Sequence, residues 1–396
     1  MQTTTRNASL ADLATLLTEQ QARKIDVVAP ASKLRSELGH LVIEGASPII
    51  EDDGVTDPNG HYRPTSVADE GIADKLGIPL PYVRKLRDGR VDLYDANVNG
   101  WLRGASKPSG VTLTPEAERI WREEHPGDKR SFLVRCFRGD DGAPGIARAF
   151  LSDSYKVIDN LDALTAALDG IRQSGVEITV DGCDLTDRRM YVRISAPEVQ
   201  ALAPALLERY RSPFSGNSGA DNPTVFAGLV LTNSETGGGA FTIVPRLTVQ
   251  VCSNGMTMTK DAVRAIHLGE KLDEGVIRWS DDTQKKNLDL ITAKARDAVS
   301  TFLDVEYMER VIRRLEETAG TPVSDAPTVV EAVAKKLSFS KEQTAGVLDH
   351  FIKGADLTAG GVMHAVTSFA QTIADADVAA DFEAAGVRAM ELAAAN

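Results

Sequence analysis

The chain has 396 residues, of which 42% are hydrophobic and 26% are charged. This length and composition allow a large buried core divided over two or three domains. The formal net charge of −13 argues against a protein that coats nucleic acid with its whole surface, because nucleic acids are polyanions. Any contact with nucleic acid is therefore expected to be local.

Cellular location is predicted from apolar runs and cysteine usage. The sequence has no apolar run long enough to cross a membrane, and its first residues do not resemble a secretory signal. The three cysteines, Cys136, Cys183 and Cys252, are far apart and odd in number, which is typical of reduced thiols. We expect a cytoplasmic protein without membrane contact.

The N-terminal part of the sequence has mainly helical patterns. Residues 1–40 carry leucines at helical spacing, and Asn7 or Ser9 is placed to cap a helix. A loop rich in Gly, Asp and Pro is expected at 51–64. Helical patterns return after it, so we expect residues 1–130 to form an N-terminal, mainly helical region.

Residues 69–88 have the spacing of a helix-turn-helix motif, with Gly77 in the turn. Basic side chains would lie on or near the exposed side of the second helix, whereas Pro79 and Pro81 stand where base-recognising side chains usually occur. The segment therefore predicts either a DNA-binding motif or two helices that only pack against each other.

The apolar period changes to two between residues 132 and 259, which is typical of strands. A helix is expected at 161–174, and strands at 224–232 and 240–251 form a long hairpin. Because glycine dominates the hairpin tip at 233–239, we expect this tip to be flexible. Residues 131–275 are thus predicted to be a central domain with a mostly antiparallel sheet, and the fold class is α+β.

The remaining chain is predicted to be helical. An apolar stripe over residues 280–318 predicts one long helix, with Ser280 or Asp281 as its cap. Shorter alanine-rich helices follow, so residues 276–396 are expected to form a C-terminal helical region. Six acidic residues and one basic residue lie between positions 356 and 391, and such acidic helices suit a protein partner.

No motif of a known catalytic or metal centre occurs in the sequence. A phosphate-binding loop, a dinucleotide fingerprint, a zinc-protease motif and a nucleophile elbow are all missing. The six histidines are scattered, and the acidic clusters at 51–53 and 281–282 suit loop and helix-cap positions better than a Mg²⁺ site. We expect no catalytic residue, metal or cofactor, with a hydrolase or nuclease of unfamiliar site as an alternative.

One stretch of the chain is enriched in basic residues. Twelve Lys and Arg stand against eight Asp and Glu between residues 84 and 138, which indicates either an anion-binding face or a solvated mixed-charge surface. Arginines of the sheet could bind phosphates as bidentate donors or pair with nearby acids. The candidate nucleic-acid-binding residues are Arg84, Lys85, Arg87, Arg90, Arg135, Arg189 and Arg246.

Several motifs follow one another in a specific order. They are Leu-Gly-Ile-Pro at 76–79, Asn-Gly-Trp-Leu at 99–102, the stretch 148–160, Val-Cys-Ser-Asn-Gly-Met at 251–256, and the stretch 351–368. In this order they resemble the phage- and plasmid-borne domain-of-unknown-function family 932, in the version of actinobacteria and their phages. The signature positions, structural or functional, are Ser152, Asp153, Tyr155, Asn160, Cys252, Asn254, Gly255 and His267.

The resemblance implies context rather than chemistry, because that family has no established activity and transfers no functional residue. It implies mobile elements and a link with DNA metabolism, and the sheet with its long hairpin is similar in outline to single-strand annealing proteins of phages. We predict a non-enzymatic accessory protein that binds DNA, in single-stranded form. The alternative is a structural or regulatory module that binds a protein partner through its C-terminal helices, and a homo-oligomer is compatible with either.

Overall fold

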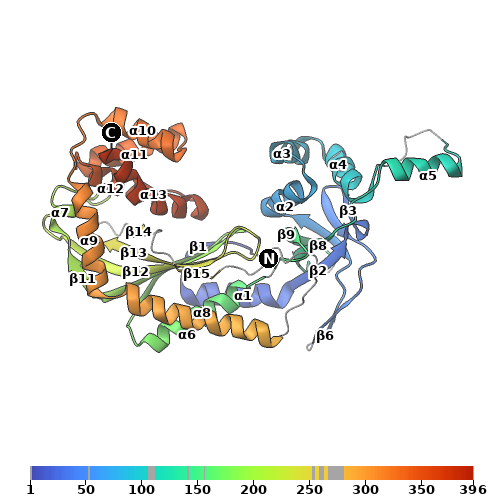
Figure 1. The fold of residues 1–396 in the computed structure, drawn as a ribbon, viewed down its shortest axis with the longest axis horizontal. Helices are drawn as coiled ribbons and strands as arrows, with labels where there is room; N and C mark the ends of the chain where they lie inside the picture. The colour runs from blue at the N-terminus through green and yellow to red at the C-terminus, as the bar shows by residue number, and fades with distance from the viewer. Residues whose placement is uncertain are drawn as a thin grey trace.

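The computed structural model describes residues 2–51, 54–105, 112–140, 142–155, 157–251, 255–257, 263–265 and 281–395. The chain forms two units, each built on its own sheet, and these lie side by side along the longest axis of the molecule (Figure 1). The sheets are mostly antiparallel and helices cover them, which confirms the predicted α+β class.

The larger sheet contains seven strands among the described residues, and all its pairings are antiparallel. Its first strand comes from the start of the chain, and the others come from the centre. In spatial order they are β1 (Thr5–Ala8), β10 (Thr179–Leu185), β11 (Met190–Leu202), β12 (Thr224–Asn233), β13 (Phe241–Val249) and β14 (Gly255–Thr257), with β15 (Val263–Ala265) also paired to β13. The predicted long hairpin is β12–β13.

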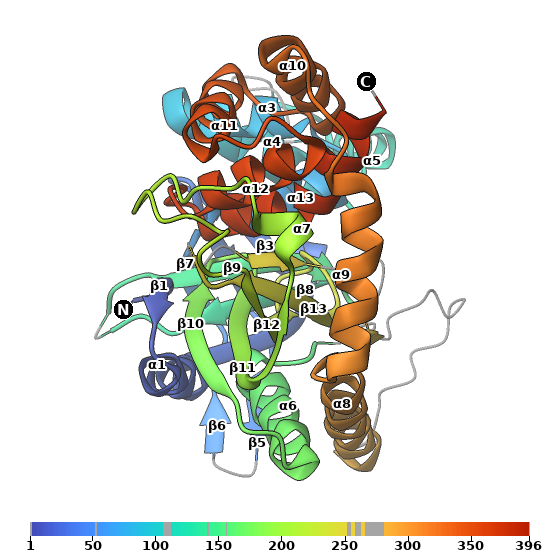
Figure 2. The same ribbon diagram turned by 90° about the vertical axis from the view of Figure 1, so that its left-hand side faces the viewer.

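Helices lie on both faces of the larger sheet (Figure 2). One face is covered by α1 (Leu10–Arg23), α6 (Asn160–Ser174) and α8 (Asp281–Phe302). At the other face lie α9 (Val305–Ala319), α10 (Ala326–Leu337), α11 (Lys341–Gly354), α12 (Ala359–Ala370) and α13 (Ala376–Ala394), and the short α7 (Pro204–Leu207) packs against α9. The predicted apolar stripe of α8 is buried here, because Ile291, Ala295 and Val299 have no exposed surface.

The smaller sheet has six strands among the described residues, antiparallel except for the parallel pair β7–β9. In spatial order they are β2 (Lys24–Pro30), β8 (Ser131–Phe137), β9 (Gly145–Ser152), β7 (Gly60–Pro64), β4 (His40–Ile43) and β3 (Leu34–Glu37). The expected boundary at residue 130 falls inside this sheet. Around it lie η1 (Ala31–Lys33), the hairpin β5 (Ile49–Glu51) and β6 (Gly54–Thr56), and α2 (Ser66–Leu76), α3 (Leu80–Gly89) and α4 (Val91–Arg103).

Two helix predictions need correction. The helix near the N-terminus ends at Arg23, and residues 24–30 form a strand because Ile25, Val27 and Ala29 alternate into the core with period two. The long helix predicted over residues 280–318 is divided into α8 and α9. The division occurs because Asp304 caps α9 by accepting a hydrogen bond from the backbone N–H of Tyr307 at 2.9 Å.

The helix-turn-helix-like segment consists of α2 and α3. Gly77 joins them in the left-handed conformation, with φ of 67°, which glycine adopts without steric cost. Val83 and Leu86 of α3 are buried in the core of the smaller unit. The two helices therefore pack as predicted, and base recognition by α3 stays a prediction. The neighbouring α5 (Pro115–Glu124) extends away from the body and buries none of its residues (Figure 1).

Cys136 and Cys183 are buried and form no disulfide, whereas Cys252 lies outside the described residues. Among the helices of the described ranges, none combines the length and the apolar character needed to cross a membrane.

Candidate functional site

Residues 233–236 of the β12–β13 hairpin tip are buried between the two units, which argues against the predicted flexibility for this part of the tip, whereas Gly237 and Gly239 are exposed. Asn233, Ser234 and Glu235 have between 1% and 7% of their surface exposed. Glycine is needed here for backbone geometry, because Gly237 and Gly239 adopt φ of 87° and 154°. The glycines thus allow a tight turn whose polar side chains face the smaller unit.

Arg135 on β8 receives this tip and has no exposed surface. Its guanidinium binds both carboxylate oxygens of Asp26 on β2, at 2.9 and 2.8 Å. It also donates to Asp159 at the start of α6, at 2.7 Å, and to the backbone carbonyl of Glu235, at 3.0 Å. Strands of the smaller sheet, helix α6 and the hairpin tip therefore meet on one buried cation.

Glu235 completes what we call the ionic junction, formed by Lys24, Asp26, Arg135, Arg148, Asp159 and Glu235. The Glu235 carboxylate accepts hydrogen bonds from Arg148 and from the backbone N–H of Asn160. Burial raises the pKa of Glu235, but the positive charges of Arg148 and Arg135 outweigh burial and lower this pKa below its ordinary value. The carboxylate stays ionised and holds the tip in place.

Asp159 occupies the N-cap position of α6, yet its carboxylate binds Arg135 and Lys24 instead of the helix backbone. Burial raises its pKa, and the charges of Arg135 and Lys24 lower it more strongly, to about 2. Every charge of the junction faces an opposite charge at short distance, which allows the buried Arg135 and Glu235 to lie among four half-buried ionisable groups. The junction is a structural centre.

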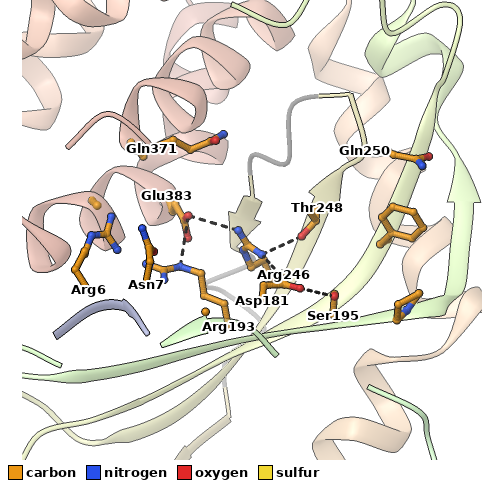
Figure 3. Close-up of a pocket in the computed structure, with 15 residues that line it drawn as sticks. Arg6, Asn7, Asp181, Arg193, Ser195, Arg246, Thr248, Gln250, Gln371 and Glu383 are labelled. Carbon is orange, nitrogen blue, oxygen red and sulfur yellow. Dashed lines mark hydrogen bonds and ion pairs between the residues drawn. The ribbon is translucent and has the colours of Figure 1, made fainter. Parts of the chain in front are cut away.

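A second polar centre is a cavity of about 580 Å³ between the larger sheet and helices α12 and α13. Such a volume is in the range of sites for small molecules. We call it the arginine pocket. Figure 3 shows that guanidinium, carboxylate, hydroxyl and amide groups converge there, and its polar lining residues are Arg6, Asn7, Asp181, Arg193, Ser195, Arg246, Thr248, Gln250, Gln371 and Glu383.

Irregular strands direct these side chains into the arginine pocket. The pairing register shifts on β1 between Thr5 and Ala8, on β10 between Val180 and Gly182, and on β11 after Ala196. Such bulges bend a strand and re-aim the side chains beside them. Asn7 has φ of 50° at the first irregularity, and Arg6 and Asn7 enter the pocket from there.

The other side chains on the sheet side of the arginine pocket, its floor, follow the regular alternation of strands β11 to β13. Arg246 and Ser195 both lie opposite Gly228 of β12, on either side of it. Glycine places no side chain between them, so the floor of the pocket stays open at this point. Thr248 follows Arg246 on the same face of β13, two residues further along.

Asp184 organises two of the three arginines from behind the pocket. Its carboxylate has no exposed surface and binds Arg6 and Arg193, the latter at 2.6 Å. The same carboxylate accepts a hydrogen bond from the backbone N–H of Asn7 at 2.7 Å. Asp184 thereby fixes β1 to β10 and holds two guanidinium groups at the pocket wall.

Arg246 is less well satisfied than the other two arginines. It is 5% exposed, donates to Thr248 at 3.0 Å and to Asp181 at 3.3 Å, and lies 3.6 Å from Glu383 of α13. Within the described part of the chain its buried Nε donates no hydrogen bond. A buried guanidinium with an unused donor lies at the edge of an open cavity.

A larger cleft of about 1020 Å³ adjoins the arginine pocket and shares Arg6 with it. It lies between α2 and α3 of the smaller unit, the β10–β11 turn and the start of α13. We call it the mixed-charge cleft, because four arginines and five carboxylates line it: Arg6, Arg84, Arg188, Arg189, Glu70, Asp187, Asp375, Asp377 and Asp381. Glu70 bridges it by binding both Arg84 and Arg188.

The structure distributes the predicted nucleic-acid-binding residues over several places. Arg84, Lys85, Arg87 and Arg90 lie on or after α3, Arg135 is in the ionic junction, Arg189 is in the mixed-charge cleft, and Arg246 is in the arginine pocket. Most are neutralised, since Arg84 pairs with Glu70, Arg87 with buried Asp69, Arg90 with Asp92, and Arg135 with Asp26 and Asp159. They do not form one continuous basic face.

Of the signature positions that the structure describes, Asn160 and Tyr155 contact the hairpin tip at the ionic junction, and Gly255 lies apart from it on β14. Ser152 ends β9, exposed Asp153 follows it, and half-buried Tyr155 packs beside Leu133 and Leu151. Asn160 is buried and accepts a hydrogen bond from Asn233 at 2.9 Å. Gly255 begins β14 opposite Thr248, whereas Cys252, Asn254 and His267 lie outside the described residues.

Sequence reasoning missed Arg6, Asp181, Asp184 and Glu383 as site residues. One signal was available, because Arg246, Thr248 and Gln250 occupy alternate positions of an otherwise apolar strand pattern. Polar residues at every second position indicate a polar face on a strand. In the ranges that the structure describes, no group of three or more His, Cys, Asp or Glu side chains is arranged to hold a metal ion.

The sequence was compared with known proteins. A family model with the description Domain of unknown function (DUF932) matches residues 149–376, more than half of the chain. The match contains Arg193 and Arg246, and it excludes Arg6 and Glu383. Neither the curated proteins nor the solved structures contain a match.

The first prediction concerns the central cation of the ionic junction. Replacing Arg135 by methionine leaves the carboxylates of Asp26 and Asp159 without this partner, and breaking a buried ion pair in this way costs about 3–5 kcal/mol. We expect the free energy of unfolding, measured by urea denaturation, to fall by this amount. The control Arg172→Gln removes an exposed pair with Asp169 and should cost less than about 1 kcal/mol. Equal losses in both variants would contradict the structural role.

The second prediction concerns the pH dependence of the ionic junction. Asp159 has a pKa of about 2 in the folded protein against 3.8 ordinarily, so its stabilising effect is complete above the ordinary value and is lost as pH falls towards 2. This shift corresponds to on the order of 2 kcal/mol.

The measurement compares urea unfolding of the wild type and Asp159→Asn between pH 6 and pH 2. The wild type should be the more stable protein at pH 6, and the difference should shrink between pH 4 and pH 2. A difference that stays constant over this range would show that Asp159 does not titrate as described.

Proposed function

The chain belongs to the family of the domain of unknown function DUF932, and from this premise we propose that it is a binding protein whose arginine pocket holds a small anionic ligand. One observation carries the proposal. Arg246 is nearly fully buried at the pocket, and the two carboxylates that its terminal nitrogens face lie 3.3 and 3.6 Å away. Charge-assisted hydrogen bonds of a guanidinium are normally about 2.7–2.9 Å long, so a ligand anion at these terminal nitrogens would form shorter contacts than the two carboxylates do.

The charges that line the arginine pocket favour an anion. Three guanidinium groups stand against the carboxylates of Asp181 and Glu383. Asp184 neutralises part of this charge, but it is fully buried behind Arg6 and Arg193. The surface that faces the cavity therefore carries more positive charge than the buried layer behind it, where Asp184 lies.

Glu383 makes no hydrogen bond of ordinary length with the arginines that it faces. Its carboxylate lies 3.6 Å from Arg246 and 3.8 Å from Arg193, and these distances are too long for hydrogen bonds. A phosphate or carboxylate of a ligand would accept charge-assisted hydrogen bonds at about 2.7–2.9 Å from the same guanidinium groups. The ligand would thus supply the short contacts that Glu383 does not make.

Binding of single-stranded DNA stays a prediction. A long polyanion needs a positive surface that follows its backbone, whereas the mixed-charge cleft contains more carboxylates than arginines. The arginine pocket, with a volume of about 580 Å³, suits a small ligand better than a long strand. The expected lack of enzymatic activity, the protein partner of the C-terminal helices, the homo-oligomer, and the phage and actinobacterial context also stay predictions.

The third prediction tests the arginine pocket with inorganic pyrophosphate as a probe, by isothermal titration calorimetry on the full chain. Pyrophosphate should bind the wild type, and Arg246→Gln should weaken binding by roughly tenfold to a hundredfold, as expected for the loss of a charged hydrogen bond. Glu383→Gln should strengthen binding by roughly tenfold, because it removes a like charge from the pocket.

Matched controls separate binding from folding. Arg246→Lys keeps the charge and should bind better than Arg246→Gln, and the exposed Arg172→Gln should bind like the wild type. Thermal unfolding of each variant shows whether it is folded. Lack of pyrophosphate binding to the wild type, or a Glu383→Gln variant that binds more weakly, would overturn the proposed function.

A further inference from the structure

The arginine pocket has an apolar end as well as a charged end. Half-buried Phe226 of β12 and exposed Pro197 of β11 line it together with Ala370 and Ala379 from the helices opposite. The small alanine side chains leave room above the floor of the pocket. A ligand that fills the cavity therefore meets guanidinium groups at one end and an aromatic ring at the other.

The register of the strands fixes the spacing of the two ends. Phe226 pairs directly with Thr248, and Gly228 pairs with Arg246, so Phe226 lies two residues from the arginine position on the same face of the sheet. Two residues along a strand span about 7 Å. The anion and the apolar part of the ligand are thus separated by one short linker.

Polar groups beside Arg246 indicate which part of the ligand adjoins its anion. Asp181 accepts hydrogen bonds from Ser195 at 2.7 Å and from Arg246 at 3.3 Å, and its side chain is 31% exposed. Carboxylates in this role bind ribose hydroxyls in nucleotide sites of other folds. The Asp181 carboxylate would repel a phosphate placed next to it, but it can accept hydrogen bonds from the hydroxyl groups of a sugar.

We propose that the ligand of the arginine pocket is a nucleoside monophosphate unit, either a free nucleotide or the terminal nucleotide of a single strand. This inference rests on the proposed function, since it names the ligand class of the same pocket. The phosphate contacts Arg246 and its neighbours, the sugar lies beside Asp181 and Ser195, and the base stacks on Phe226. Stacking on one aromatic side chain explains the apolar end without base-specific contacts.

The experiment measures binding of three probes to the full chain by calorimetry: inorganic phosphate, ribose 5-phosphate and adenosine 5′-monophosphate. The nucleotide should bind at least tenfold more tightly than ribose 5-phosphate, because it adds a stacked base. Phe226→Ala and Phe226→Leu should remove this difference. Thermal unfolding shows whether these variants are folded.

Phe214→Ala is the control, because Phe214 is an exposed phenylalanine that does not line the pocket. It should keep the full preference for the nucleotide. A second arm tests whether a short single strand with a 5′-phosphate displaces the nucleotide. Displacement assigns the site to strand ends, and lack of displacement assigns it to free nucleotides.

The two proposals fail in different ways. Equal affinities for the nucleotide and ribose 5-phosphate, or a Phe226→Ala variant that keeps the preference, would overturn the nucleotide assignment and leave the anion pocket standing. If none of the three probes binds, the proposed function itself is wrong.

Discussion

The structure depends on one buried cation. Arg135 comes from the smaller sheet, and its partners come from another strand of that sheet, from the start of α6 and from the hairpin tip of the larger sheet. A buried guanidinium without partners would be prohibitively costly, so each partner must be in place before the cation is stable. The requirement fixes the position of the hairpin relative to the smaller sheet, and through the hairpin it orients the larger sheet that carries the arginine pocket.

The arginine pocket repeats this principle with one difference. Asp184 pairs with Arg6 and Arg193, just as Asp26 and Asp159 pair with Arg135. In both centres the carboxylates offset the desolvation of the guanidinium groups. At the junction the carboxylates surround the cation, so nothing is left to bind a ligand. At the pocket Asp184 occupies only the interior side, and the carboxylates nearest to Arg246 lie 3.3 and 3.6 Å away. Arginine–carboxylate pairs thus form a fully paired structural centre at the junction and a partly paired candidate binding site at the pocket.

Local patterns in the sequence predicted much of the fold, and long-range contacts account for what they could not predict. Period-two alternation indicated β12 and β13, and the apolar stripe of α8 was visible at Ile291, Ala295 and Val299. The glycines of the hairpin tip indicated a turn, but nothing local revealed that Arg135 would bury it, because the two lie 100 residues apart. Residues 24–30 were assigned to a helical region because their partner strand, β8, begins only at residue 131.

The site was harder to predict for the same reason. Arg246 was identified as a basic residue of the sheet, but Glu383 lies on a helix more than one hundred residues later, and Arg6 precedes everything else. Pocket walls therefore come from both ends of the chain, which has a consequence during synthesis. The N-terminus of a nascent chain leaves the ribosome first. The side of the cavity opposite the sheet is therefore incomplete until α13 has been synthesised. Only a chain synthesised through α13 then binds the ligand, and a product truncated before α13 carries the sheet side of the pocket without the helix that covers it.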